Sequence, residues 1–144
     1  MRLVLDTNIV VSALLWKGAP RDLLRAATEA RVELFTSDPL LEELAEVLSR
    51  SKFKKKIAEL DVSSDQVLGT YARRAELVVP MPLPRIAPDR DDDVVIGTAL
   101  AAQANFAVDG DRTLLAVREY EGVRIVSVRE ASDAIVRSFA HKDL

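Results

Sequence analysis

The chain has 144 residues, of which 49% are hydrophobic and 30% are charged, a length and balance that fit one folded domain and exclude disorder along the whole chain. It contains no cysteine and a single histidine, His141, which excludes disulfides, cysteine-ligated metals and thiol catalysis and argues strongly against a Ser-His-Asp triad. The formal net charge of −3 excludes the overall basic field of many nucleic-acid-binding proteins.

Short apolar runs alternate with amphipathic segments along the first half of the chain, a pattern that predicts strands alternating with helices. In chain order, we expect a strand at 3–5, a helix that starts at 6–8 and continues to 15, and a helix at 20–30. A strand at 32–36 follows, then a helix capped by Asp38 and reaching Leu48, helices at 51–60 and 63–75, and a strand at 77–79.

The second half begins with residues 80–88, which hold four of the six prolines and therefore predict an extended loop. After it we expect a helix at 93–104, a strand at 106–108, a short helix at 113–117, a strand at 123–127 and a final helix at 130–139. The sequence shows no repeat and no linker, so a single domain over residues 1–144 is expected.

This alternation predicts the α/β class, with a mostly parallel central sheet of about five strands flanked by helices on both faces. In such sheets, sites form at the carboxyl ends of the strands. Asp6 follows the first predicted strand, and Asp109-Gly110-Asp111 follows the fourth. The sequence therefore predicts that acidic side chains gather at one edge of the sheet.

Each acidic motif also has a purely structural explanation. Asp6 and Asp111 are good caps for the helices that follow them. Asp91, Asp92 and Asp93 can form a solvated helix N-terminus that the helix dipole favours. For any one of these motifs alone, capping is a sufficient explanation.

Glu43 fits a surface role less well than the neighbouring acids do. Leu40 and Val47 lie three and four residues away and Leu44 is adjacent, which places Glu43 beside the apolar face of its helix. The neighbouring Glu42 and Glu46 are expected to be ordinary exposed acids.

Taken together, the acids favour a shared site. Asp6, Glu43, Asp93 and Asp111 in one crevice repel one another unless a cation neutralises them. Without cysteine or a usable histidine, such a site suits Mg²⁺ or Mn²⁺, whose preferred ligands are oxygens. Phosphoryl transfer and phosphodiester hydrolysis are the reactions that such a site supports.

Four segments, LVLDTN at 3–8, LLEEL at 40–44, DDDVVIGTA at 91–99 and VDGD at 108–111, resemble the motifs of the PIN-domain nucleases. The resemblance covers nearly the whole chain in the right order. It is strongest to the PIN-family toxins of bacterial and archaeal toxin–antitoxin pairs, which are relatives of VapC.

The resemblance implies a three-layer α/β sandwich and an endoribonuclease that depends on Mg²⁺ or Mn²⁺. It implies that the protein is a toxin neutralised by a cognate antitoxin protein and forms a homodimer. Asp6, Glu43, Asp93 and Asp111 match the four catalytic acids of the family, and Asp6, Asp93 and Asp111 are the implied metal ligands. Asn8 matches the polar residue that supports the first acid.

The chain departs from the family at two positions. Asp109 stands where the family usually carries threonine or serine, and Thr113 stands where relatives often have a second aspartate. Asp109 is therefore expected either to replace that hydroxyl in orienting the attacking water or to weaken the site by repulsion. Neither departure predicts loss of activity, because the four main acids are present.

The basic run at 50–56 is the densest positive patch of this acidic chain. A solvated helix face is the ordinary explanation of such a run. If the run borders the acidic crevice, it would bind the phosphates of RNA. The lysines concerned are Lys52, Lys54, Lys55 and Lys56.

Two other functions are compatible with a chain of this class. A non-catalytic PIN-like module that binds RNA or protein stays open as the alternative. A receiver-like phosphoacceptor domain does not, because it requires a lysine after the fifth strand, where Val128 stands. Charged residues follow Met1 too early for a signal peptide and no apolar run reaches membrane-spanning length, so the cytoplasm is the expected location.

Overall fold

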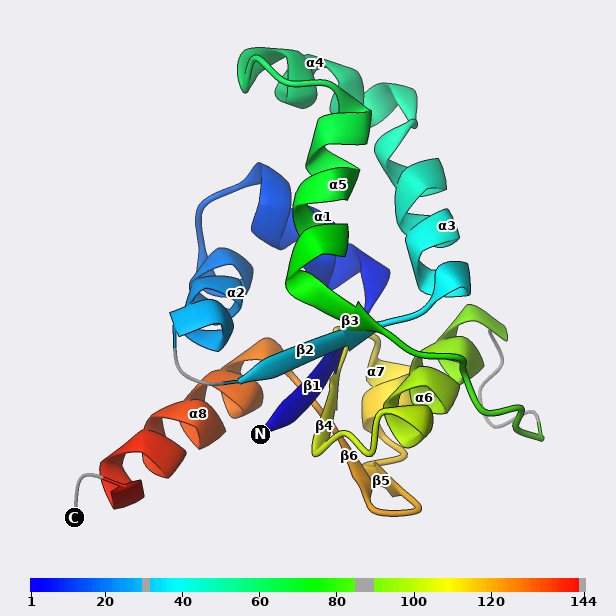
Figure 1. Cartoon of the computed structure of the whole chain (residues 1–144), viewed down its shortest axis with the longest axis vertical. Helices are drawn as coiled ribbons and strands as arrows, with labels where there is room; N and C mark the ends of the chain where they lie inside the picture. Colours follow the sequence, from blue (N-terminus) through cyan, green and yellow to red (C-terminus); the bar gives the residue numbers. More distant parts are fainter. Residues whose placement is uncertain (30–31, 85–89, 143–144) are drawn as a thin grey trace.

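Strands and helices alternate along the chain and build a layered α/β structure (Figure 1). The computed structural model describes residues 1–29, 32–84 and 90–142. The strands are β1 Arg2–Leu5, β2 Glu33–Thr36, β3 Ala75–Leu77, β4 Phe106–Val108, β5 Glu119–Tyr120 and β6 Val123–Val126. The helices are α1 Thr7–Leu15, α2 Ala19–Glu29, α3 Asp38–Leu48, α4 Ser51–Glu59, α5 Ser64–Arg74, α6 Arg90–Ala101, α7 Arg112–Leu115 and α8 Val128–Lys142. Within these described ranges, no helix is both long and apolar enough to cross a membrane.

The strands form one six-stranded sheet in the order β3-β2-β1-β4-β6-β5. All neighbours are parallel except β5, which pairs antiparallel with β6 through the turn at Glu121 and Gly122, both of which have positive φ. The predicted mostly parallel sheet is confirmed, with six strands where about five were expected. The additional strand has two residues, too few to show a period in the sequence.

Two hydrophobic cores lie on opposite faces of this sheet. Side chains alternate along β1, so Leu3 and Leu5 belong to the core under α1, α2, α3, α5 and α8. Val4 points the other way, into the core beneath α6 and α7. The helices therefore cover both faces, which confirms the predicted three-layer sandwich (Figure 1).

Three of the element boundaries that differ from the predictions have a clear local cause. β3 starts at Ala75, two residues before the predicted strand, because α5 already ends at Arg74 and Ala75 pairs with Leu34. The cap of α3 is Ser37 and not Asp38, which is the first residue of the helix. α6 starts at Arg90, so the acidic run lies inside its first turn. Of the predicted loop at 80–88, residues 85–88 lie outside the described residues.

The chain that follows β3 is fastened to α6 by a backbone contact. The Met81 N–H donates a hydrogen bond of 3.0 Å to the carbonyl of Gly97. A Cβ at position 97 would collide with the Met81 carbonyl oxygen, so only glycine allows this approach. One residue later, the buried hydroxyls of Ser37 and Thr98 lie 2.9 Å apart and tie α6 to the segment after β2.

Candidate acidic metal site

Asp6 and Asp109 are placed by the hydrogen-bond ladder of the central sheet. Their preceding residues, Leu5 and Val108, are register partners in the parallel strands β1 and β4. The Asp6 N–H donates to the Val108 carbonyl at 2.9 Å, and the Asp109 N–H donates to the Val126 carbonyl at 3.0 Å. The two acids therefore leave neighbouring strands at the same carboxyl edge, where sites of parallel sheets form.

Local hydrogen bonds orient both carboxylates. Asp6 is the N-cap of α1, and its Oδ2 accepts a hydrogen bond from the Asn8 N–H at 3.2 Å. Asp109 Oδ1 accepts from the Asp111 N–H at 2.9 Å. The other carboxylate oxygen of Asp109, Oδ2, is buried and has no hydrogen-bond partner. A buried carboxylate oxygen without a partner is costly, and a proton or a cation beside it would lower this cost.

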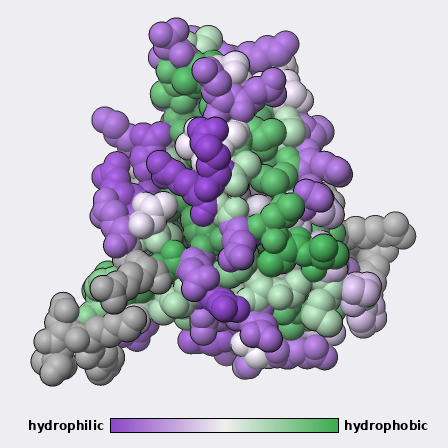
Figure 2. Space-filling model, viewed as in Figure 1, coloured by the Kyte–Doolittle hydropathy of each residue, from purple (hydrophilic) through white to green (hydrophobic). Residues whose placement is uncertain are grey.

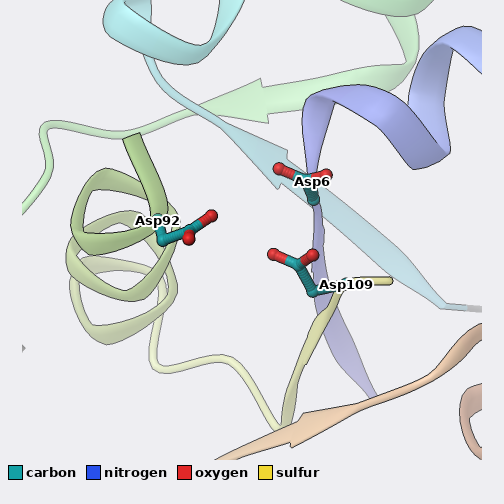
Figure 3. A group of neighbouring side chains, drawn as sticks. All are labelled: Asp6, Asp92 and Asp109. Atoms are coloured by element: carbon teal, nitrogen blue, oxygen red, sulfur yellow. The ribbon is translucent and has the colours of Figure 1, made fainter. Parts of the chain in front are cut away.

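Asp92 joins this pair from the opposite side. It lies in the first turn of α6, three and four residues before the buried Val95 and Ile96. This spacing turns its carboxylate toward the sheet. Asp6, Asp92 and Asp109 each offer an oxygen within 4.8 Å of the others, and their exposed fractions are only 8%, 8% and 2%. Figure 3 shows the three carboxylates pointing toward one common space.

The three acids form the floor of a pocket of about 440 Å³. Glu43, half-buried on α3, and the exposed Asp111, which caps α7, contribute two more carboxylates to its walls. The complete lining is Asp6, Asn8, Ile9, Ser12, Glu43, Asp92, Asp109, Gly110 and Asp111. Five carboxylates from four separate stretches of sequence thus meet in one concave site.

The electrostatics of the pocket are those of crowded like charges. Burial, together with the nearby charges of Asp109, Glu43 and Asp92, raises the pKa of Asp6 to about 7, against the opposing hydrogen bond from the Asn8 N–H. Burial also raises the pKa of Asp109, which hydrogen bonds from the Asp111 and Gly110 N–H groups oppose. The pocket therefore favours a proton or a cation, and its all-oxygen donor set fits a hard divalent ion.

The structure brings most of the sequence-predicted site residues together and adds one. Asp6, Asn8, Glu43, Asp109 and Asp111 all line the pocket. From the acidic run, Asp92 lies there. Asp93, the residue that the sequence reasoning selected, is half-buried one position further along α6 and does not line the pocket.

The choice between these two neighbours follows from helix geometry. Successive side chains on a helix point about 100° apart, so only one of them can face the sheet. The apolar stripe of Val95, Ile96 and Ala99 lies three, four and seven residues after Asp92. That spacing was a signal that could have identified Asp92 from the sequence.

The lysines of the basic run are on a different part of the molecule. Lys52, Lys54, Lys55 and Lys56 belong to α4, which lies at the ends of α3 and α5 that are remote from the sheet (Figure 1). None of them lines the acidic pocket. Lys52 instead lies over the ring of Phe53, 5.0 Å from its centroid, and Phe53 packs edge-on against Trp16.

Comparisons with known proteins agree with this architecture. The crystal structure of VapBC2 from Rickettsia felis bound to a DNA fragment from their promoter contains a chain that is 17% identical in sequence to this one. The match has a TM-score of 0.62 and covers 88% of this chain and 98% of that chain, which shows a shared fold. No curated protein matches. The family model of the PIN domain matches residues 2–113, more than half of the chain, and the protein therefore belongs to the PIN domain family.

Proposed function

We propose that this protein is a divalent-metal-dependent endoribonuclease and the toxin of a toxin–antitoxin pair. The observation that carries the proposal is the convergence of Asp6, Asp92 and Asp109, three buried carboxylates with oxygens within 4.8 Å of one another. Membership of the PIN domain family supports nuclease activity. The choice of RNA as the substrate rests on the resemblance to the VapC-related toxins.

Mg²⁺ or Mn²⁺ is the proposed cofactor. Asp6, Asp92 and Asp109 are the residues that would hold it, and the unpartnered Oδ2 of Asp109 is the oxygen that most needs a cation. The exposed Asp111 lines the same pocket and adds a further carboxylate to it. Such an ion supplies positive charge to the phosphate oxygens as the phosphodiester is cleaved.

The remaining side chains of the pocket position the reactants. The Asn8 N–H holds one carboxylate oxygen of Asp6 in place. Glu43, on the wall of the same pocket, is half-buried and is our candidate to accept a proton from the attacking water. The water oxygen then bonds to phosphorus, the bond from phosphorus to the leaving nucleotide oxygen breaks, and that oxygen takes up a proton.

A separate antitoxin chain and a second copy of this protein are the proposed partners. The support for the antitoxin is the similar fold of a chain in the VapBC2 structure. The homodimer and the cytoplasmic location rest on the sequence-based expectations alone. Co-expression with the product of a small adjacent reading frame, followed by size-exclusion chromatography, tests both partnerships.

Cleavage of a labelled single-stranded RNA by the purified chain is the direct test of the activity. We expect cleavage with Mg²⁺ or Mn²⁺, none in EDTA, and none by Asp6→Asn, which removes one charge without changing the size of the side chain. Cleavage that persists in EDTA would overturn the metal mechanism. RNA binding without cleavage in either metal would identify the protein as a non-catalytic PIN-like module.

A further inference from the structure

A second pocket lies between α2 and α5, over the C-terminal half of α1. It has a volume of about 460 Å³ and shares no lining residue with the acidic pocket. Its lining contains three arginines and one acid, among Ala13, Leu14, Arg21, Leu24, Arg25, Thr28, Glu29 and Arg74. In a chain whose net charge is −3, this is a local concentration of positive charge.

Arg21 is held in a fixed orientation within this pocket. Its Nε donates to the carbonyl of Ala13 and its Nη2 to the carbonyl of Leu14, each at 3.1 Å. These bonds use two of the five N–H donors of the guanidinium group. The group is therefore pre-positioned by the end of α1 while three donors remain for a ligand.

Arg25 and Arg74 add further positive charge to the pocket. Arg25 lies one turn after Arg21 on the same face of α2, a spacing at which like charges repel. Arg74 reaches the pocket from the end of α5. Among the residues that the structure describes, none makes an ion pair with Arg21, Arg25 or Arg74, although Glu29 is part of the same lining.

Capping explains part of this arrangement. Arg21 satisfies the last carbonyls of α1, and a cation at the end of α5 suits the helix dipole. Within the described residues, Arg25 neither satisfies helix carbonyls nor lies at the C-terminal end of a helix, and its charge repels that of Arg21. A concave surface concentrates the field of such charges, so the pocket attracts anions.

We propose that this arginine pocket, defined by Arg21, Arg25 and Arg74, binds phosphate groups. The planar fork of a guanidinium group matches two phosphate oxygens, and Arg21 is already oriented to present it. Hydrophilic residues gather on the face over α2 and the sheet-side end of α5, where a charged ligand has access (Figure 2). The phosphate belongs either to a small polyphosphate or to the backbone of RNA.

Calorimetric titration separates these two sources. The full chain carrying Asp6→Asn, which prevents RNA cleavage, is titrated in EDTA with pyrophosphate and with a short single-stranded RNA. The test variant adds Arg25→Gln and Arg74→Gln, both exposed positions, so that Arg21 continues to hold α1. The control adds Arg118→Gln and Arg124→Gln, which remove the same charge from a pocket of about 420 Å³ that also contains Glu119 and Glu130.

A loss of roughly tenfold or more in pyrophosphate affinity in the test variant, with the control unchanged, assigns the pocket to small polyphosphates. Weaker binding of RNA alone, with a salt slope reduced by about 1.4, assigns it to the RNA backbone. Equal effects in test and control variants, or no effect in either, would overturn the proposal. Because binding is measured without metal or cleavage, these outcomes do not depend on the proposed nuclease activity.

Arg21→Lys supplies a second measurement. Lysine keeps the charge but lacks the guanidinium fork, so we expect affinity for the bound phosphate to fall while the melting temperature shows that the chain is folded. Unchanged affinity in a folded Arg21→Lys variant would show that the site is an unspecific positive surface.

Discussion

Asp6 and Asp109 lie side by side because the residues before them, Leu5 and Val108, are register partners in adjacent parallel strands. The separation of the two backbones is therefore set by the hydrogen-bond ladder at the centre of the sheet. The backbones cannot move apart without breaking strand pairing. The mutual repulsion of the two carboxylates is relieved by a proton or a cation, and this restriction leads to the first two predictions.

Asp109→Asn is expected to raise the melting temperature of the metal-free protein. The substitution removes one of the crowded charges and places an amide N–H₂ near the carboxylate of Asp6. A gain of about 1 kcal/mol corresponds to roughly 2–4 °C for a domain of this size. Thermal melting in EDTA measures it, with the exposed Asp61→Asn as the matched control, since asparagine tolerates the positive φ of 55° there.

Added Mg²⁺ or Mn²⁺ should reverse this order. Metal stabilises the wild type by binding its folded state and should stabilise Asp109→Asn less, because the variant binds the ion more weakly. If Asp109→Asn melts below the wild type in EDTA and metal shifts neither protein, these acids serve only as structural caps.

The stability of the metal-free protein should also depend on pH through Asp6. Its pKa is about 7 in the folded state against an ordinary 3.8, so the folded chain binds this proton more tightly than the unfolded chain does. The stabilising contribution is complete below about pH 4 and is lost as the pH rises to about 7. Melting in EDTA across this range should show a difference between wild type and Asp6→Asn that changes in this direction. A difference that is constant with pH would contradict the raised pKa.

Asp92→Asn and Asp93→Asn form a matched pair that tests the geometry of α6. Only Asp92 lies with Asp6 and Asp109, so Asp92→Asn should lower metal affinity by about a hundredfold or more, while Asp93→Asn stays within a few-fold of wild type. Metal-induced shifts of the melting temperature and RNA cleavage rates are the two measurements. The reverse order would favour Asp93, the residue predicted from the sequence.

Tyr71→Phe tests the core independently of the site. The Tyr71 hydroxyl is buried without a hydrogen-bond partner, and burial raises its pKa well above the usual value of 10. Removing this desolvated group should stabilise the protein by about 1 kcal/mol, which urea unfolding measures. Tyr120→Phe, at the half-buried Tyr120 of β5, should have no effect. A clear loss of stability in Tyr71→Phe would mean that its hydroxyl has a partner in solution.

The elements that the sequence predicted well are those with a buried face. β1 and β4 are short apolar runs that end at an acid, so their positions and the acidic edge after them could be read directly. The predicted boundary is wrong where the sequence has no hydrophobic periodicity. The first turn of α6 contains charged residues only, so the predicted start of this helix at residue 93 is three residues too late.

The sequence predicts that acids gather at this edge of the sheet, but it does not say which residue of the acidic run faces the other acids. Glu43 was identified because its apolar neighbours turn it partly inward, and it does line the acidic pocket. The third acid required knowing which of two adjacent residues faces the sheet, and the resemblance to a family pointed to Asp93. The arginine pocket was not predicted at all, since Arg21, Arg25 and Arg74 meet only through the packing of α2 and α5 on α1.

Gly97 takes part in no proposed chemistry, yet the approach of Met81 leaves no space for a side chain there. Any larger residue must push the Met81 backbone away or displace α6, the helix that carries Asp92. In a saturation-mutagenesis map, position 97 should therefore be as intolerant as the acids themselves. An exposed helix position such as Glu42 should accept most replacements. A screen that ranks residues by lost activity would place this glycine among the catalytic groups, although its contribution is only the absence of a side chain.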